Sequence, residues 1–415
     1  MQKLNIAIVV GAFPTVSETF IVNQITSLID EGHSVKILAS KKGSTAIVHN
    51  KITAYNLLDY VEYKEKPVYN KAKRLYGFVK LIYNNFFQIN WRLLFKSLNY
   101  SKYGKKAISL KAFYKRKFFI LNKEFDIIHV HFATNAVAIA NHKSEGFLKN
   151  GKLIVTFHGF DLIPNNEMDY NIRYKSLLQE ASAFTVNSKY LKGILERLNL
   201  KTKNIHILPV GLDTDYFKRI GQREIKPTYN ILFCGRLIQL KGPDIAIDIL
   251  VELLNRGHNH IHLTLIGDGE LKNALTNRIE DEDLKRFVSI EGAHSQEFVK
   301  AQMDAANVLL MPGTHDSKTK RAETQGLVIQ EAQAMELPVV ISDVGGMKYG
   351  MIPNETGFVV PENDIKGFAD AIETLLVNEK LRKSMGQKGR EYVVANYDNT
   401  VLYLKLLKIY QRILK

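Results

Sequence analysis

The chain is poor in cysteine and in long apolar runs, and each absence excludes a class of protein. Its 415 residues include one cysteine, Cys234, so no disulfide can form within the chain. No apolar stretch approaches the roughly 20 residues that a membrane-spanning helix needs. The opening MQKLNIAIVVGAFP has a short apolar run, one lysine and no small-residue cleavage site, which favours a first β-strand ending at Gly11 over a signal peptide. These features predict a cytoplasmic protein without a spanning segment.

Acidic residues are nearly missing from residues 64–123. This segment holds 16 lysines and arginines against one acid, Glu65, and its net +15 equals the charge of the whole chain. It also carries 14 aromatic residues. In RLYGFVKLIYNNFFQINWRLLFKSL the apolar residues recur every three or four positions, which predicts an amphipathic helix.

Three roles suit a segment that is both basic and aromatic. An anionic membrane would attract the lysines while the aromatic rings enter its interface. In a second role the rings form the core of a helical insertion, and in a third the segment binds nucleic acid through phosphates and bases. We expect an anionic membrane surface as partner and no nucleic acid, and the sequence leaves open whether the segment binds membrane or only packs.

Short apolar runs alternate with helical patterns along the chain, as in parallel sheets with helical crossovers. One series runs from LNIAIVVG to NIHILPVG, and the pattern restarts at YNILFCG (229–235). We therefore expect an α/β fold with two Rossmann-like, doubly wound domains that face a central cleft. The first domain is residues 1–208, with residues 64–123 as a helical insertion, and the second is residues 209–394. A last helix near residues 395–415 is expected to pack back on the first domain.

Polar residues and glycines follow the predicted strands of the first unit, where doubly wound sheets bind ligands. His129 precedes His131 by two residues and is expected to face the opposite side of the strand. The residues that we expect at these strand ends are Gly11, Ser17, Glu18, His131, His158 and Asp161.

The second unit has charged and glycine-rich strand ends. Arg236 and Lys241 follow a strand and lie between glycines, which resembles a phosphate clamp. In ETQGLVIQEA (323–332), a helix opened by Gly326 would offer free N–H groups to an anion, with Glu323 just before the helix and Glu331 inside it. This combination predicts a ligand that has both phosphates and hydroxyls.

The chain resembles glycosyltransferase family 4, retaining nucleotide-sugar transferases with the GT-B architecture. The matching stretches are HGFD (158–161), VGLDTDYF (210–217), GRL…KG (235–242) and ETQGLVIQEAQAMELPVV (323–340). FPTVSETFIVNQI (13–25) is similar to the colanic-acid-type exopolysaccharide transferases. After the first glutamate of its last motif the family often has a glycine or an aromatic residue, where this chain has Thr324 and Gln325.

The resemblance implies a role for each matching residue. The catalytic group would be His158 beside the donor sugar, Arg236 and Lys241 on the diphosphate, and Glu323 on the sugar hydroxyls. Other donor-binding residues would be Gly11, Gly235, Gly292, His294, Gly326, Leu327, Val328 and Glu331, the last on the ribose. Ser17, Glu18, His131 and Asp161 would lie on the acceptor side. No metal and no cofactor is expected.

We expect a retaining transferase that moves a sugar from a nucleoside diphosphate, UDP by family habit, to a lipid-linked or surface-polysaccharide glycan at the cytoplasmic membrane face. The architecture also hosts nucleotide-sugar 2-epimerases, which consume the donor without an acceptor. A nucleic-acid-binding module built on residues 64–123 is a third possibility.

Overall fold

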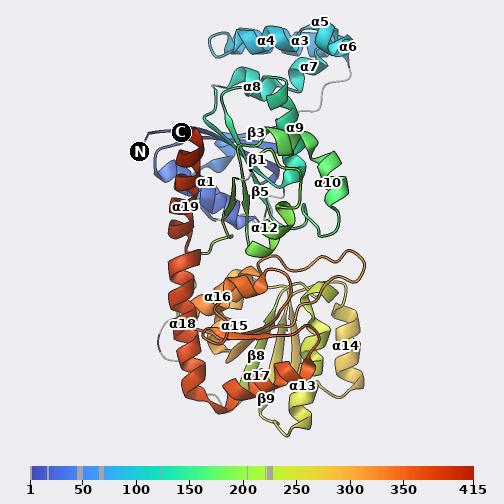
Figure 1. The fold of residues 1–415 in the computed structure, drawn as a ribbon, viewed down its shortest axis with the longest axis vertical. Coiled ribbons are helices and arrows are strands. Elements are labelled where there is room, and N and C mark those ends of the chain that lie inside the picture. Colours follow the sequence, from blue (N-terminus) through green and yellow to red (C-terminus); the bar gives the residue numbers. More distant parts are fainter. Residues whose placement is uncertain are drawn as a thin grey trace.

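A computed structural model of the chain describes residues 2–15, 18–43, 50–64, 70–122, 124–202, 204–219, 221 and 228–415. Two parallel sheets divide it into two stacked domains (Figure 1). The first sheet has the strand order β3-β2-β1-β4-β5-β6-β7 and the second β10-β9-β8-β11-β12-β13. In both, the order reverses beside the first strand, which is the doubly wound arrangement. The prediction of two Rossmann-like domains is confirmed.

The strands are short and mostly buried, as expected of parallel sheets covered on both faces. Those of the first sheet are β1 (Asn5–Phe13), β2 (Ser34–Lys42), β3 (Val61–Tyr63), β4 (Ile127–His131), β5 (Lys152–Phe157), β6 (Ala183–Val186) and β7 (Ile205–Ile207). Those of the second are β8 (Tyr229–Cys234), β9 (Ile261–Ile266), β10 (Val288–Gly292), β11 (Val308–Met311), β12 (Val339–Ser342) and β13 (Gly357–Val360). The expected end of the first strand at Gly11 is wrong, because β1 pairs with β2 as far as Phe13.

Helices cover both faces of the first sheet. They are α1 (Thr19–Asp30), α2 (Asn50–Ala54), α9 (Ala133–Ser144), α10 (Glu167–Arg173), α11 (Lys175–Glu180) and α12 (Lys189–Leu195), with a 3₁₀ turn, η1 (Leu57–Tyr60). One face of the sheet packs on α9 and α11, and the other on α1. The final helix of the chain completes the second face.

The basic segment forms a helical subdomain at the end of the molecule away from the second sheet (Figure 1). Its helices are α3 (Lys71–Asn85), α4 (Trp91–Ser97), α5 (Tyr100–Tyr103), α6 (Lys105–Ile108), α7 (Lys111–Tyr114) and α8 (Lys117–Leu121). The amphipathic stretch is therefore two helices and not one. The chain restarts at Asn90, whose side chain accepts the Leu93 N–H and caps α4. Phe113 and Ile120 anchor a small core beneath α3 and α4.

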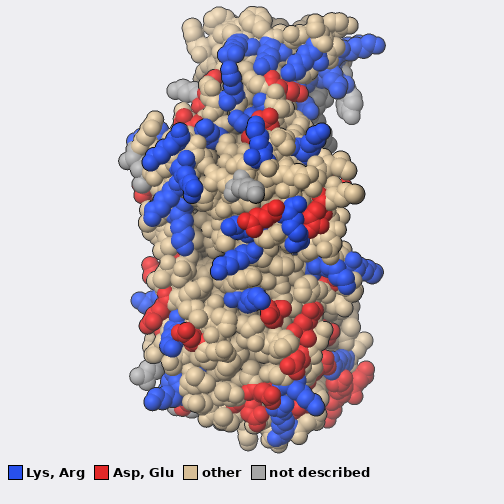
Figure 2. All heavy atoms as spheres, in the orientation of Figure 1, with Lys and Arg blue, Asp and Glu red and all other residues tan. Residues whose placement is uncertain are grey.

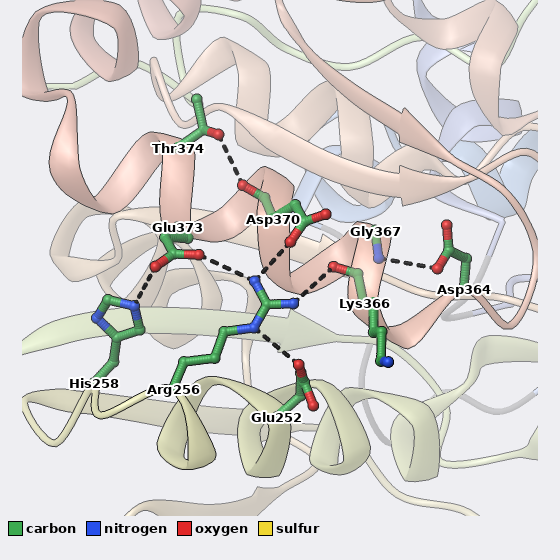
Figure 3. A network of polar contacts seen from close by, with 9 residues as sticks. All are labelled: Glu252, Arg256, His258, Asp364, Lys366, Gly367, Asp370, Glu373 and Thr374. Atoms are coloured by element: carbon green, nitrogen blue, oxygen red, sulfur yellow. Dashed lines mark hydrogen bonds and ion pairs between the residues drawn. The ribbon is translucent and has the colours of Figure 1, made fainter.

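The second domain carries α13 (Pro243–Asn255), α14 (Lys272–Asp281), α15 (Gln296–Ala305), α16 (Leu327–Ala334) and α17 (Ile365–Val377), with 3₁₀ turns η2 (Gln239–Lys241) and η3 (Met347–Gly350). Figure 3 shows how α13 and α17 are joined. Arg256 donates to Glu252 on its own helix and to Asp370 and Glu373 on α17, and Glu373 also pairs with His258. This network lies at the C-terminal end of α13, whereas Lys241 of the site described below lies just before the N-terminus of that helix.

The last two helices, α18 (Glu379–Tyr397) and α19 (Asn399–Leu414), run from the second domain to the first (Figure 1). Leu407 and Tyr410 of α19 are buried in the same core as α1. The bend between the helices is fixed to the interdomain linker, where Leu212 bridges Asp398. Thr214 donates its hydroxyl to the Asp398 carboxylate. In the part of the chain that the structure describes, no helix is both long and apolar enough to cross a bilayer.

Candidate active site

The two sheets bring their ligand-binding edges together. The order of the first reverses between β1 and β4 and that of the second between β8 and β11, and crevices form at the carboxyl ends of such strands. The loop before α16 touches the first domain: Thr324 Oγ1 lies 3.3 Å from the His158 carbonyl oxygen and accepts from Asn187 Nδ2 at 2.9 Å. Gly159 allows this approach, because a Cβ there would lie 2.7 Å from the Thr324 methyl group.

Glu323 is held from two sides at the heart of this junction. Its Oε2 pairs with the Lys241 ammonium from the loop after β8. Its Oε1 accepts the backbone N–H groups of Thr324 and Gly326, at 3.0 and 3.1 Å, and more weakly that of Gln325. Burial alone would raise the pKa of this carboxyl, but Lys241 and the N–H groups outweigh it and hold the pKa at about 2. Glu323 therefore stays ionised, and its ion pair holds the Lys241 side chain in place.

Two glycines that the sequence did not single out shape the same loop. A Cβ on Gly345 would lie 2.2 Å from the Glu323 carbonyl oxygen, and one on Gly346 would lie 1.8 Å from that of Thr324. The Gly346 N–H donates to the Glu323 carbonyl at 2.7 Å. The two adjacent glycines of VGG, shortly after a buried strand, could have indicated this in the sequence, since adjacent glycines often mark close backbone approach.

The N-terminus of α16 lies next to this glutamate. Gly326 is the N-cap residue and has φ +74°, a left-handed conformation that favours glycine. Leu327 and Val328 are the first helical residues, so their N–H groups belong to the first turn, which lacks intrahelical acceptors. The structure therefore places a helix N-terminus, a feature suited to an anion, near Lys241.

Arg236 and Glu331 are the other charged residues that we expect on the donor side. Arg236 follows Gly235 at the end of β8, its side chain is exposed, and it has no carboxylate partner among the described residues. Glu331 lies in the second turn of α16, close enough to Cys234 at the end of the same strand for its charge to raise the pKa of that thiol. Burial raises the pKa of Glu331 to about 7. Burial also raises the pKa of Cys234 to about 12, so this thiol is a poor nucleophile.

Three histidines form a stack behind the junction. The His131 and His158 rings are 5.4 Å apart and joined by a 3.1 Å Nδ1–Nε2 hydrogen bond. His129 stacks on His131 at 4.7 Å, so the expectation that His129 and His131 face opposite sides is wrong: residues two apart share a strand face. Burial lowers the pKa of His131 to about 3 and holds that of His158 well below its usual value. Both rings are therefore neutral at physiological pH, and His131 lies behind His158.

The other residues that we expect on the acceptor side have different surroundings. Asp161 accepts N–H groups from His158, Gly159 and Ala133, so it shapes the loop that carries His158. Glu18 caps α1 without a side-chain bond to the helix, and burial raises its pKa. Ser17 lies outside the described residues.

The remaining glycines and His294 lie at other strand ends. Gly11 lies within β1, where a Cβ would make an ordinary 3.5 Å contact with Asn135. Gly292 ends the edge strand β10 with φ +81°. His294 is exposed, stacks on Phe298 at 3.8 Å and bonds the Glu291 carbonyl. Across residues 2–15, 18–43 and the other described ranges, no three His, Cys, Asp or Glu side chains form a metal-binding group.

Both halves of the chain match known protein families. The sequence profile described as Glycosyltransferase Family 4 matches residues 17–216, and that described as Glycosyl transferases group 1 matches residues 217–392. The putative colanic acid biosynthesis glycosyltransferase WcaL of Salmonella typhimurium is 26% identical over 97% of this chain and 98% of its own. The amylovoran biosynthesis glycosyltransferase AmsK of Erwinia amylovora is 27% identical, with the same coverage.

Solved structures share the fold. A glycosyltransferase from Rickettsia africae superposes with a TM-score of 0.70 over the whole of both chains, at 20% identity. Anabaena Alr3699/HepE, solved in complex with UDP, superposes with a TM-score of 0.72 over 99% of this chain and all of its own, at 15% identity. The architecture is GT-B, as the sequence predicted. Since the two profiles together span residues 17–392, the chain belongs to glycosyltransferase family 4 and is a glycosyltransferase.

Proposed function

We propose that this enzyme transfers a sugar, with retention of configuration and without a metal ion, from a UDP-sugar to a glycan of an exopolysaccharide or other surface polysaccharide. The observation that carries the proposal is the cluster at α16. Arg236, Lys241 and a helix N-terminus offer positive charge to a diphosphate, and Glu331 offers a carboxylate to hydroxyls. The names of WcaL and AmsK support a polysaccharide product, and the UDP complex of HepE supports the nucleotide.

The same cluster explains how the reaction could proceed. The bond from the sugar C1 to the diphosphate oxygen breaks, and the acceptor oxygen bonds to C1 on the same face. The acceptor's proton passes to the departing phosphate oxygen, so no enzyme base is required. Lys241, Arg236 and the helix N–H groups stabilise the charge that develops on this phosphate. His158 is neutral and lies beside the junction, where it would position the donor sugar by hydrogen bonding.

We place the acceptor on a lipid carrier at the cytoplasmic face of the membrane, and the helical subdomain supports this placement. On the face that Figure 2 shows, basic residues dominate over the subdomain and the first domain, whereas acidic residues are frequent on the second domain. The outer face of α3 and the turn after it carry an apolar stripe: Leu75, Tyr76, Val79, Tyr83, Phe86 and Phe87. Leu75, Tyr76, Val79 and Tyr83 are separated by one, three and four residues and so share one side of α3, and Phe86 and Phe87 lie in the turn that follows it. Tyr83 is 84% exposed and Phe87 99%.

A stripe of this kind is costly to expose to water and suits a lipid interface. Aromatic rings favour the boundary between headgroups and acyl chains, and basic residues around them attract anionic headgroups. Lys73 and Lys80 are exposed on the same helix. The buried face of α3 packs on the subdomain core, so the stripe is additional to that core and not part of it.

Calorimetric titration tests the donor site. UDP, GDP and ADP would be titrated into the wild type and into Arg236→Ala and Glu331→Ala, with Arg286→Ala, an exposed arginine of the second domain, as the matched control. We expect selective UDP binding, weakened by about tenfold or more in Arg236→Ala because a charge-assisted contact contributes about 1.5–3 kcal/mol. Failure of all three nucleotides to bind the folded wild type would refute the donor proposal.

Product analysis distinguishes the transferase from the two alternative functions. Consumption of the UDP-sugar without an acceptor, with inversion at C2, would favour the epimerase. Salt-dependent binding of single or double strands without transfer would favour the nucleic-acid module. Unchanged transfer after treatment with EDTA is the expected result if Arg236 and Lys241 carry the charge stabilisation alone.

A further inference from the structure

A cavity of about 1220 Å³, open mouth included, lies where the two domains, the interdomain linker and the last two helices meet. Its walls come from the start of α12 in the first domain, from η3 in the second, and from α18 and α19. Gln325, in the loop before α16, also lines this interdomain cavity, whereas Arg236 and Lys241 do not. The cavity is therefore distinct from the expected donor site, and it is large enough for a small-molecule ligand.

Three lysines from three different elements line the interdomain cavity. Lys189 begins α12, Lys348 lies in η3 and Lys405 lies in α19. Lys189 is exposed and the other two are half-buried, and none of the described residues that line the cavity is acidic. Lys348 pairs with Asp343 at 2.8 Å, whereas neither Lys189 nor Lys405 forms an ion pair with a described carboxylate. Positive charge gathered around a cavity without acidic neighbours attracts anions.

Tyr349 brings two of these lysines together at the boundary between the domains. The Lys189 ammonium, from the first domain, lies 5.9 Å from the centre of the Tyr349 ring, and the Lys348 ammonium, from the second, lies 5.8 Å from it. The Tyr349 carbonyl accepts from the Tyr392 and Tyr397 hydroxyls, at 3.3 and 3.0 Å, which fixes this residue against α18. One ligand can therefore contact cations from both domains.

The rest of the wall and its place in the molecule limit the kind of anion. The linker and the turn after η3 add apolar surface from Ile207, Pro209 and Met351. A small single anion would contact one ammonium group at a time, whereas two linked phosphate groups can contact lysines on both sides of the boundary. The exposed apolar stripe lies on the subdomain at the other end of the first domain, so a lipid headgroup bound there would not reach this cavity (Figure 1).

We propose that the interdomain cavity binds a soluble metabolite with two or more linked phosphate groups, held between Lys189 and Lys348 with Lys405 as a third cation. This site goes beyond the transferase reaction, because the two lysines that carry it have no role in the expected donor or acceptor contacts. A ligand that joins the two domains here would restrict their movement relative to each other. It would also lie against Gln325, in the loop that holds the donor-side glutamate.

The test is a calorimetric titration of inorganic pyrophosphate into the full chain saturated with UDP, so that the donor site is filled. Lys189→Gln and Lys348→Gln each remove one ammonium group, and Lys380→Gln, an exposed lysine at the other end of α18 from the cavity, is the matched control. We expect one pyrophosphate per chain in the wild type and the control. In each cavity variant binding should be about tenfold weaker, the loss expected for one charge-assisted contact. Sulfate should bind the wild type more weakly than pyrophosphate does.

The outcomes distinguish this site from the donor site and from general attraction to a basic protein. UDP binding should be unchanged in both cavity variants, which also shows that they are folded. Pyrophosphate binding that further UDP displaces, or that Arg236→Ala abolishes, would place the anion at the donor site and overturn the proposal. So would no pyrophosphate binding, equal binding by the wild type and both cavity variants, or an equal loss in Lys380→Gln.

Failure of the donor proposal would leave a separate result. If the wild type binds no UDP, the same titration is made without nucleotide. Weaker pyrophosphate binding by the two cavity variants, with the control unchanged, would then still support the interdomain cavity.

Discussion

Gln325, in the loop before α16, forms two hydrogen bonds with the backbone of Val210, in the linker between the domains. Val210 N–H donates to Gln325 Oε1 at 2.8 Å, and Gln325 Nε2 donates to the Val210 carbonyl at 2.8 Å. The neighbouring Glu323 belongs to the donor cluster, and Thr324 touches the His158 loop. Three consecutive residues therefore connect Lys241, the first domain and the interdomain linker. Two of them, Thr324 and Gln325, are where this chain departs from the family's usual motif.

The first prediction concerns this connection. Gln325→Leu keeps the size of the side chain but removes both bonds to Val210, and we expect destabilisation by about 1–3 kcal/mol. We expect UDP to bind both proteins and to make the wild type more compact by closing the cleft. We expect this compaction to shrink or vanish in Gln325→Leu, because the loop before α16 is no longer hydrogen-bonded to the linker. Small-angle scattering with and without UDP measures the compaction. Gln296→Leu, on an exposed helix start, is the control, and the same compaction in Gln325→Leu would show that the linker closes independently of this residue.

The second prediction follows from Glu331. Burial raises its pKa from 4.5 to about 7, so the folded protein binds more protons than the unfolded chain between these values. The contribution of Glu331 to stability therefore falls as the pH rises through this window, whereas the buried histidines, such as His131 and His158 with their lowered pKa values, act in the opposite direction in any variant. Glu331→Gln removes the cost of the buried charge, and at about pH 8 it should unfold at a higher temperature than the wild type, by the equivalent of about 2–3 kcal/mol. Near pH 4 the two should coincide.

Ligand binding should show the opposite dependence. The ionised carboxylate is the better acceptor for two hydroxyl groups, so UDP affinity should rise with pH in the wild type. Any dependence that persists in Glu331→Gln reports titration of the diphosphate itself. If the difference in stability between the two proteins stays constant from about pH 4.5 to pH 7, Glu331 does not titrate in this window.

The third prediction concerns the Lys241–Glu323 pair, whose side chains are 14% and 18% exposed. Lys241→Met leaves a buried carboxylate without its cation and should destabilise the protein by about 2 kcal/mol or more, whereas Lys241→Met combined with Glu323→Gln should recover part of this loss. Thermal unfolding of the single and double variants gives the coupling energy. Lys348→Met breaks the more exposed pair with Asp343 and should cost about 1 kcal/mol or less. Equal losses in Lys241→Met and Lys348→Met would contradict a desolvated donor-site pair.

The sequence predicted the fold well because parallel sheets leave strong local signals. Buried strands such as β11 and β12 are nearly continuous apolar runs, and their spacing by helices indicates crossovers. The position of Gly326 at the start of a helix was also predictable, because glycine there admits the left-handed backbone. The break between α3 and α4 was missed because the apolar period continues across it, while a single asparagine cap ends it.

Other features of the site depend on contacts between distant parts of the chain, which no local pattern reports. Gln325 and Val210 are 115 residues apart, and the interdomain cavity combines Lys189 with Lys348 and Lys405. Gly345 and Gly346 matter only because the Glu323 loop lies against them. The orientation of His129 is a different case, since the period of a strand was enough to place it beside His131.

The final prediction tests the membrane face. Vesicles with and without anionic lipid would be sedimented with the wild type, with Tyr83→Ser, with Phe87→Ser and with Val377→Ser. Val377 is the matched control because it is 71% exposed but lies on the second domain. Burying one large apolar side chain is worth about 1.5–3 kcal/mol, so each stripe variant should bind anionic vesicles about tenfold or more weakly than the wild type, and the control should not change.

The lipid dependence distinguishes the two components of this surface. Loss of anionic lipid, or added salt, should weaken binding of every variant in proportion, because the lysines act independently of the aromatic rings. UDP binding should stay constant throughout, since the stripe lies on the subdomain away from the donor loop (Figure 1). If Tyr83→Ser and Phe87→Ser bind vesicles as well as the wild type does, the rings do not enter the interface. The exposed stripe would then need a protein partner, and the lysines alone would account for attraction to the membrane.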